Sequence, residues 1–364
     1  MFTRVHHDAP DLGPLAQVAG ASRLAEVLVL VVEIADLADR RHAAQRDAPH
    51  LARRQPDGRE LALLGQGSVM LVFWTSGRHP LVFLPPPEHG LNAERTSLAG
   101  QNNRHFEHIK LHWNTLGDIG CALSLPDPLP SEKIPVVLVL GGLVTGENSI
   151  RYLKNAGNNA IVGYTWPVPV RLNGLGDFML QAPDLYHRVM TIPGQVASAL
   201  RWLIEQPWAD TERISLLGFS QGALAVPAVQ NIAAHDGIHI GWTIIAYGGA
   251  PLGALLAANP HMKPPWLRKA LAPLVDLVFH PLEPTIHLPH LSGKFLVLEG
   301  RDDRLIPKTA RNRLREAVPE PKTVITFEGD HLGVGADKMA LLQNIIETSR
   351  KWLIENGAIN KGPD

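Results

Sequence analysis

Apolar and polar positions along the chain follow two periods from residue 105 onward, and these predict strands and helices that alternate. The segments 108–114 and 120–126 alternate residue by residue, which predicts an antiparallel pair of strands. The segment 134–142 (IPVVLVLGG) is a continuous apolar run, typical of a strand buried on both faces of a parallel sheet. Further strands are predicted over 159–166, 213–219, 241–249, 294–300 and 322–329.

Between these strands, apolar residues recur every three to four positions, which is the period of an α-helix. Helices are predicted over 147–156, 191–207 and 336–355, directly after Ser220, and from Pro307. A long loop is expected over 167–188. This order predicts an α/β fold, with a mostly parallel central sheet and helices on both of its faces.

The first hundred residues have a different composition. No lysine precedes Lys110 and no tyrosine precedes Tyr152, while arginine, histidine, alanine and aspartate are frequent. One helix is expected around 14–45, and the Pro- and Gly-punctuated segment 83–92 predicts a boundary. We therefore interpret residues 1–100 as an N-terminal helical and irregular extension, and residues 105–356 as the main domain.

Charge and apolar length exclude several classes of partner. The net charge is -1 and the pI is about 7.0, so neither nucleic acid nor an anionic membrane is an expected partner. The most apolar candidate span, 24–38, carries three acidic residues, so stable membrane insertion is not expected.

The single cysteine, Cys121, excludes an intramolecular disulfide framework. Residues 61–77 resemble a weak signal-peptide core without a cleavage site, so we expect a cytoplasmic protein, with secretion as the alternative.

Three chemically distinctive side chains follow three of the predicted strands. Ser220 comes after 213–219, Asp303 (beside Asp302) after 294–300, and His331 after 322–329. In sheets of this kind, sites form at the carboxyl ends of the strands. A serine hydroxyl is a poor nucleophile that needs an adjacent base, and a histidine oriented by a carboxylate supplies one. The placement therefore predicts nucleophilic catalysis by serine.

The local motifs carry a family resemblance. Gly218-x-Ser220-x-Gly222, the GRDDRLIP turn (300–307) and the GDHLG turn resemble the α/β-hydrolase fold superfamily over about 105–356. The segment 202–223 is also similar to the dienelactone-hydrolase and prolyl-oligopeptidase-like branches. The resemblance implies a nucleophile elbow at Ser220, with His331 as the base and Asp303 as the acid. It further implies an oxyanion hole formed by backbone N–H groups. The first donor is expected from Gln221 and the second from Gly142 or Leu143.

Each of the three residues also has an ordinary structural interpretation. Ser220 could be a turn residue, and His331 a loop histidine. Asp303 could serve only to cap the helix that starts at Pro307, in which case Asp302 is the competing acid. We prefer Asp303 because its spacing from Gly300 and Pro307 matches the turn of the family.

Two apolar segments are candidate walls of a substrate site. The insertion 251–292 is expected to form a small cap with a helix over 264–279, in which Leu274 and Leu277 face the substrate. The alternative is that this helix packs as ordinary core. Trp166, before the Pro-rich segment 167–183, is the second candidate. Walls with so little charge favour an uncharged acyl or alcohol group.

Neither cofactor nor metal is expected. The histidine groups at 105, 108 and 112 and at 280, 287 and 290 fit no standard zinc spacing and are interpreted as surface or packing residues. The sequence therefore predicts a serine hydrolase that cleaves a small-molecule carboxylic ester or thioester through an acyl-enzyme. A peptidase or acyltransferase on the same fold is the near alternative. A catalytically inactive hydrolase fold that serves as a binding module is the alternative from a different class.

Overall fold

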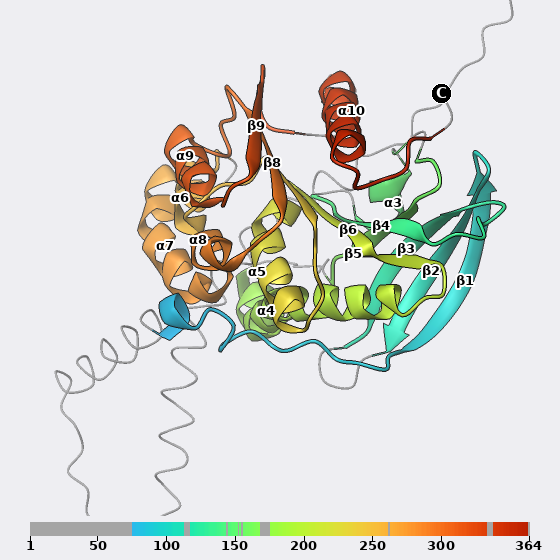
Figure 1. Ribbon diagram of the computed structural model, residues 1–364. Helices are drawn as coiled ribbons and strands as arrows, with labels where there is room; N and C mark the ends of the chain where they lie inside the picture. Colours follow the sequence, from blue (N-terminus) through green and yellow to red (C-terminus); the bar gives the residue numbers. More distant parts are fainter. Residues whose placement is uncertain are drawn as a thin grey trace, which may run out of the picture.

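The computed structural model describes residues 75–112, 117–142, 145–151, 153, 156–167, 175–260, 263–332 and 338–362 (Figure 1). In this part of the chain, one nine-stranded sheet has the order β1-β2-β3-β5-β4-β6-β7-β8-β9. Its first four strands in that order pair antiparallel, and all the remaining pairs are parallel. The strands are β1 (Asn92–Gln101), β2 (Arg104–His112), β3 (Ile119–Pro126), β4 (Ile134–Leu140), β5 (Ala160–Thr165), β6 (Ala209–Phe219), β7 (Trp242–Ala246), β8 (Lys294–Gly300) and β9 (Lys322–Phe327).

Helices cover both faces of this sheet, as the sequence predicts (Figure 1). They are α3 (Glu147–Ile150), α4 (Leu175–Ile204), α5 (Gln221–His235), α6 (Leu252–Ala258), α7 (Pro265–Val278), α8 (Pro284–His287), α9 (Lys308–Ala317) and α10 (Met339–Glu355). Alternate residues of β4 show the two layers. Val136 belongs to the apolar cluster with α4 and α5, and Val137 to the cluster with α3 and α10. Because successive side chains of a strand point to opposite faces, this central strand is apolar throughout.

The sheet begins earlier in the chain than the sequence indicates. β1 (Asn92–Gln101) pairs with β2 although its residues fall almost entirely within the expected extension 1–100. Its side chains are exposed except for the half-buried Leu98, so the strand is held by backbone hydrogen bonds and has no apolar pattern to reveal it. The expected helix at 14–45 and nearly all of 61–77 lie outside the described residues.

Residues before β1 also pack on the main domain. Leu84 is buried in a cluster with Met190 of α4 and Val275 of α7. The Glu88 backbone N–H donates to the Ser198 hydroxyl at 2.9 Å. At the other end, the buried Ala358 extends the domain beyond residue 356. The described chain therefore packs across the predicted boundaries at 100, 105 and 356, because buried residues lie on both sides of them.

α4 begins at Leu175, where the sequence predicts the loop 167–188. Pro183 and Pro193 lie within this helix. Pro183 falls in the predicted loop, because proline removes a backbone donor and normally ends or kinks a helix, whereas Pro193 already falls in the expected helix 191–207. α3 (Glu147–Ile150) is conversely shorter than the expected helix at 147–156.

The insertion 251–292 contains the expected helix as α7 (Pro265–Val278). Val275, Phe279 and Leu282 are buried in the cluster that also holds Ala197 of α4 and Ala228 of α5. One side of α7 therefore packs against the helical layer as ordinary core, which was the alternative interpretation of this segment. None of the helices in the described part of the chain has the length and apolar character needed to cross a bilayer.

His287 on α8 is a packing histidine inside this insertion. It is fully buried, accepts a hydrogen bond from Asn231 Nδ2 at its Nδ1, and donates from Nε2 to the Pro281 carbonyl. Burial lowers the pKa of His287 from 6.5 to about 4. The ring is therefore neutral in the folded protein at pH values where the unfolded chain already binds a proton.

Because the folded pKa of His287 is depressed, the free energy of unfolding should fall as the pH drops below 6.5 and should continue to fall until about pH 4. The expected contribution is a loss of about 1–2 kcal/mol between pH 6.5 and pH 5. Urea unfolding across this range measures it. The His287→Gln variant, which has no titrating group here, should lose less stability over the same interval. Parallel pH profiles of the two proteins would contradict the expectation.

Candidate functional site

Ser220 lies on a sharp turn between β6 and α5. Its φ of 54° and ψ of -112° are strained for a non-glycine residue, and its N–H donates to the Ala246 carbonyl of β7 at 2.8 Å. A Cβ on Gly222 would overlap the Leu140 carbonyl oxygen, and one on Gly218 would come within 2.7 Å of the Gly222 carbonyl oxygen. Glycine at both positions therefore allows β4, β6 and α5 to approach closely enough to form the turn.

The three residues predicted from the strand ends lie in one hydrogen-bonded chain. Ser220 Oγ is 2.7 Å from His331 Nε2, and His331 Nδ1 is 2.7 Å from Asp303 Oδ2. An ionised carboxylate can only accept hydrogen bonds, so Nδ1–H donates to Asp303 and Nε2 accepts from the serine hydroxyl. The Asp303 side chain is fully buried and that of His331 is 9% exposed. The geometry thus leaves a basic nitrogen facing the serine hydroxyl.

Asp303 and Asp302 have different surroundings. Asp303 Oδ1 accepts the backbone N–H groups of Leu305 and Ile306, at 2.8 and 2.9 Å, and Oδ2 accepts the imidazole. Asp302 is exposed. Asp303 therefore organises the turn before α9 and also contacts His331, so the turn interpretation and the acid interpretation of this residue are compatible.

A polar clamp, formed by Asp330, Arg304 and Arg311, holds the turns that carry the acid and the histidine. Asp330 Oδ1 accepts the N–H groups of Arg304 and His331, while Asp330 Oδ2 accepts the Arg304 guanidinium. Arg311 of α9 is buried and donates to the carbonyls of Arg301 and Ile306. Sequence reasoning missed these three residues, because the clamp joins turns that only the folded sheet brings together.

The charge of Asp330 is stable to acid. Partial burial alone would raise the pKa of its carboxyl group. The hydrogen bonds from Arg304 and His331 and the charge of Arg304 outweigh this effect and lower that pKa to about 2. The clamp therefore keeps its charge throughout the neutral and mildly acidic range.

Two predicted oxyanion donors flank Ser220. Gln221 is the first residue of α5, where a backbone N–H has no partner within the helix. Gly142 follows β4 and lies beside the serine, because a Cβ added to it would be 3.1 Å from Ser220 Cβ. Leu143, the alternative to Gly142, lies outside the described residues. Backbone N–H groups at these positions suit the stabilisation of negative charge on a substrate oxygen.

Trp166 packs behind the loop after β4. Its indole Nε1–H donates to the Gly141 carbonyl at 3.0 Å, its ring meets Tyr164 edge to face, and only 7% of the residue is exposed. These contacts support the loop that carries Gly142. A direct contact between Trp166 and a substrate stays a prediction.

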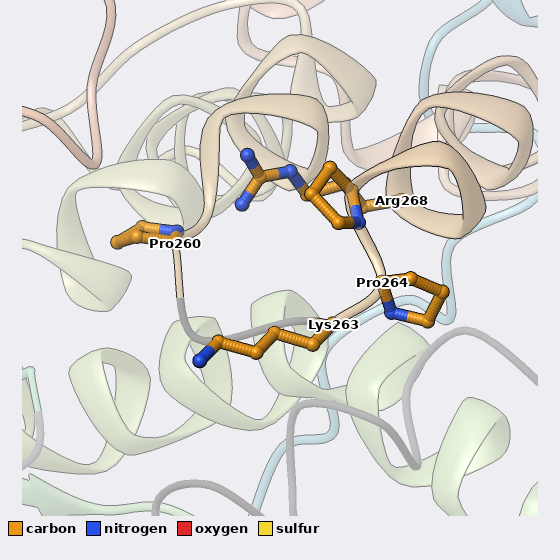
Figure 2. A pocket seen from close by; sticks show the side chains of 5 residues that line it. Pro260, Lys263, Pro264 and Arg268 are labelled. Carbon is orange, nitrogen blue, oxygen red and sulfur yellow. The ribbon is translucent and has the colours of Figure 1, made fainter.

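Leu274 and Leu277 are half-buried on α7, and their role as a substrate wall stays a prediction. Figure 2 shows an open hollow at the connection between α6 and α7, lined by Pro260, Lys263, Pro264, Pro265 and Arg268. Its lining includes none of Ser220, Asp303 and His331, and neither of these leucines. Among the described residues, no cluster of three or more histidine, cysteine or acidic side chains could hold a metal ion.

Comparison with known proteins finds similarity in structure but not in sequence. No protein-family model and no curated protein matches the chain. Acetyl xylan esterase 1 from Thermoanaerobacterium sp. JW/SL YS485 is similar over 76% of this chain and 93% of its own, with a TM-score of 0.51 and 12% identity. An acetyl xylan esterase from Paenibacillus sp. R4 matches with the same coverages, a TM-score of 0.52 and 14% identity.

A third solved structure agrees with these two. S-formylglutathione hydrolase from Agrobacterium tumefaciens is similar over 72% of this chain and 99% of its own, with a TM-score of 0.50 and 17% identity. All three proteins have the same architecture, with a mostly parallel sheet covered by helices. The chain therefore has the α/β-hydrolase fold.

Proposed function

We propose that this protein is a serine hydrolase that cleaves carboxylic esters or thioesters of small molecules. The observation that carries the proposal is the hydrogen-bonded chain from Ser220 through His331 to Asp303. It lies at the carboxyl ends of parallel strands, where sites of open α/β sheets form. The strained turn at Ser220 adds support, because strain of this kind concentrates at functional sites.

In the proposed reaction, Ser220 Oγ attacks the ester carbonyl carbon while its proton moves to His331 Nε2. The carbonyl π electrons move to oxygen, and the backbone N–H groups of Gln221 and of the Gly142 loop stabilise the resulting oxyanion. The tetrahedral intermediate collapses, the C–O bond to the alcohol breaks, and the imidazolium returns the proton to the departing oxygen. An ester between Ser220 and the acyl group remains.

Deacylation repeats these steps with water as the nucleophile. His331 takes a proton from the water, the hydroxide adds to the acyl carbon, and the Ser220 oxygen leaves with the proton from the imidazolium. Asp303 stays ionised throughout, fixes the imidazole tautomer and stabilises its positive charge. In this scheme, three side chains and two backbone N–H groups of the protein carry out the whole reaction with the ester and water.

Acyl groups of modest size are the first substrates to test. Solved structures with the same fold include acetyl xylan esterases and an S-formylglutathione hydrolase, so both oxygen and sulfur esters are sensible candidates. The predicted apolar walls favour uncharged substrates. We propose a small-molecule ester as the partner of this site.

The test is turnover of a series of p-nitrophenyl esters from acetate to decanoate, with matching thioesters, combined with labelling by a fluorophosphonate. We expect release of p-nitrophenol far above buffer hydrolysis for at least the shorter esters, and one label located on Ser220 by mass spectrometry. A folded protein that hydrolyses none of the series and takes up no label would instead be an inactive hydrolase fold used for binding.

A further inference from the structure

Tyr247 occupies a central position beside the three residues of the site. It follows β7 directly, and β7 lies in the sheet between β6, which ends just before Ser220, and β8, which leads to Asp303. The residue is 1% exposed. A large side chain at the carboxyl end of a central strand therefore lies inside the site, where the proposed mechanism gives it no role.

The Tyr247 ring packs directly against the imidazole of His331. Their centroids are 5.6 Å apart and their planes are inclined by 87°, an edge-to-face contact of the kind that aromatic rings prefer. A Cβ on Gly300, the last residue of β8, would lie 2.8 Å from Tyr247 Cε1. Glycine at position 300 thus leaves the space that the ring fills between the end of β8 and the imidazole.

The backbone of Tyr247 is strained. Its φ of 58° lies in the left-handed region, which a bulky residue rarely adopts. The other non-glycine residues with positive φ in the described chain are two turn asparagines, Asn102 and Asn103, and Ser220 itself. Asparagine tolerates this region, whereas tyrosine and serine occupy it at a cost in free energy. The Tyr247 N–H donates to the Leu298 carbonyl at 2.7 Å, which fixes this conformation.

The Tyr247 hydroxyl is buried and has no hydrogen-bond partner among the described residues. Burial, and then the nearby charge of Asp303, raise the pKa of this hydroxyl to about 12. It therefore stays protonated at neutral pH and is not a base. An unpaired buried hydroxyl destabilises a fold, so the useful part of this side chain is its ring.

We infer that Tyr247 is a positioning residue whose ring holds the His331 imidazole in line with Ser220 and Asp303 and keeps water away from the Nδ1–Oδ2 hydrogen bond. The imidazole can otherwise rotate about its side-chain bonds, which would move Nε2 away from the Ser220 hydroxyl. The kinetic part of this inference rests on the proposed hydrolase function.

The kinetic test compares Tyr247→Leu with Tyr247→Phe. Both replacements lack β-branching and must adopt the same left-handed backbone, so they differ mainly in whether a ring contacts His331. We expect Tyr247→Leu to lower kcat about 10- to 100-fold with KM nearly unchanged, because a small misplacement of a reacting group has an effect of this size. Labelling of Ser220 by the fluorophosphonate should slow in parallel. Tyr247→Phe should rescue both rates.

A second readout does not depend on turnover. The proton on His331 Nδ1, bonded to Asp303, is expected to give a low-field proton NMR signal, which a His331→Gln sample assigns by its disappearance. We expect this signal in the wild type and in Tyr247→Phe. Faster exchange with water should broaden it in Tyr247→Leu. Circular dichroism at the assay temperature verifies folding, and Tyr247→Met takes the place of a leucine variant that does not fold.

Two results would overturn the inference. One is a leucine (or methionine) variant with wild-type kcat, labelling rate and NMR signal. The other is a phenylalanine variant as impaired as the leucine variant, since the hydroxyl and not the ring would then be needed. If the wild-type protein shows neither turnover nor labelling, the proposed function fails, whereas the NMR comparison still decides whether Tyr247 positions His331.

Discussion

The Ser220→Ala and His331→Ala substitutions should each lower kcat for ester hydrolysis by on the order of 10⁴- to 10⁶-fold, while the protein stays folded. Ser220 Oγ supplies the nucleophile and His331 Nε2, 2.7 Å away, supplies its base, so neither group works without the other. The double variant should therefore be about as slow as either single variant, and the losses should be far from additive. Steady-state kinetics with a p-nitrophenyl ester measures all three.

A matched control comes from Ser97, an exposed serine on the edge strand β1. Ser97→Ala should keep wild-type kcat, and circular dichroism should show the same fold for all the variants. The assignment fails if Ser220→Ala or His331→Ala retains more than about a tenth of the wild-type kcat, since loss of a nucleophile or base in such a unit is far larger.

The acid is expected to be Asp303, so Asp303→Asn should lower kcat by on the order of 10⁴-fold. An asparagine amide would donate a hydrogen bond to His331 Nδ1, which would place the imidazole proton on Nε2. Nε2 then could no longer accept the proton of Ser220. Turnover of the best p-nitrophenyl ester at pH 7 to 8 tests this, with Asp303→Glu as a variant that keeps the charge but alters its position.

Asp302→Asn is the matched control for this substitution, since it makes the same chemical change one residue away. Asp302 is exposed, whereas the Asp303 side chain is fully buried against His331. Its replacement should change kcat by less than about twofold, as expected for a surface residue. A stronger effect at position 302 than at 303 would reverse the assignment of the acid without changing that of the fold.

The parts of the fold that were predictable are those in which local sequence fixes the backbone. The buried apolar runs at β4 and β8 permit little besides a strand with helices on both faces. Glycine at 218 and 222 similarly indicates the tight approach at the elbow, and His331 lies within hydrogen-bond distance of both Ser220 and Asp303.

The parts that were missed depend on contacts between distant segments. β1 has exposed side chains and is a strand only because β2 offers its backbone groups. Arg304 and Asp330 meet because β8 and β9 are neighbours, and neither residue type signals this locally. The left-handed backbone of Tyr247 is equally invisible, since aromatic residues normally favour extended structure at the end of a strand.

The two strained residues of the site have a consequence for the rest of the chain. Ser220 and Tyr247 each hold a left-handed backbone, which costs about 1–3 kcal/mol at each position. The net stability of a folded domain is only about 5–15 kcal/mol. The strain at these two residues therefore lowers the free energy of unfolding, and less stability remains to offset destabilising mutations elsewhere in the chain. A destabilising mutation far from the site would be tolerated in a protein of this fold without the two strained residues. The same mutation would bring this protein closer to unfolding, so the site itself limits how much sequence change the chain tolerates.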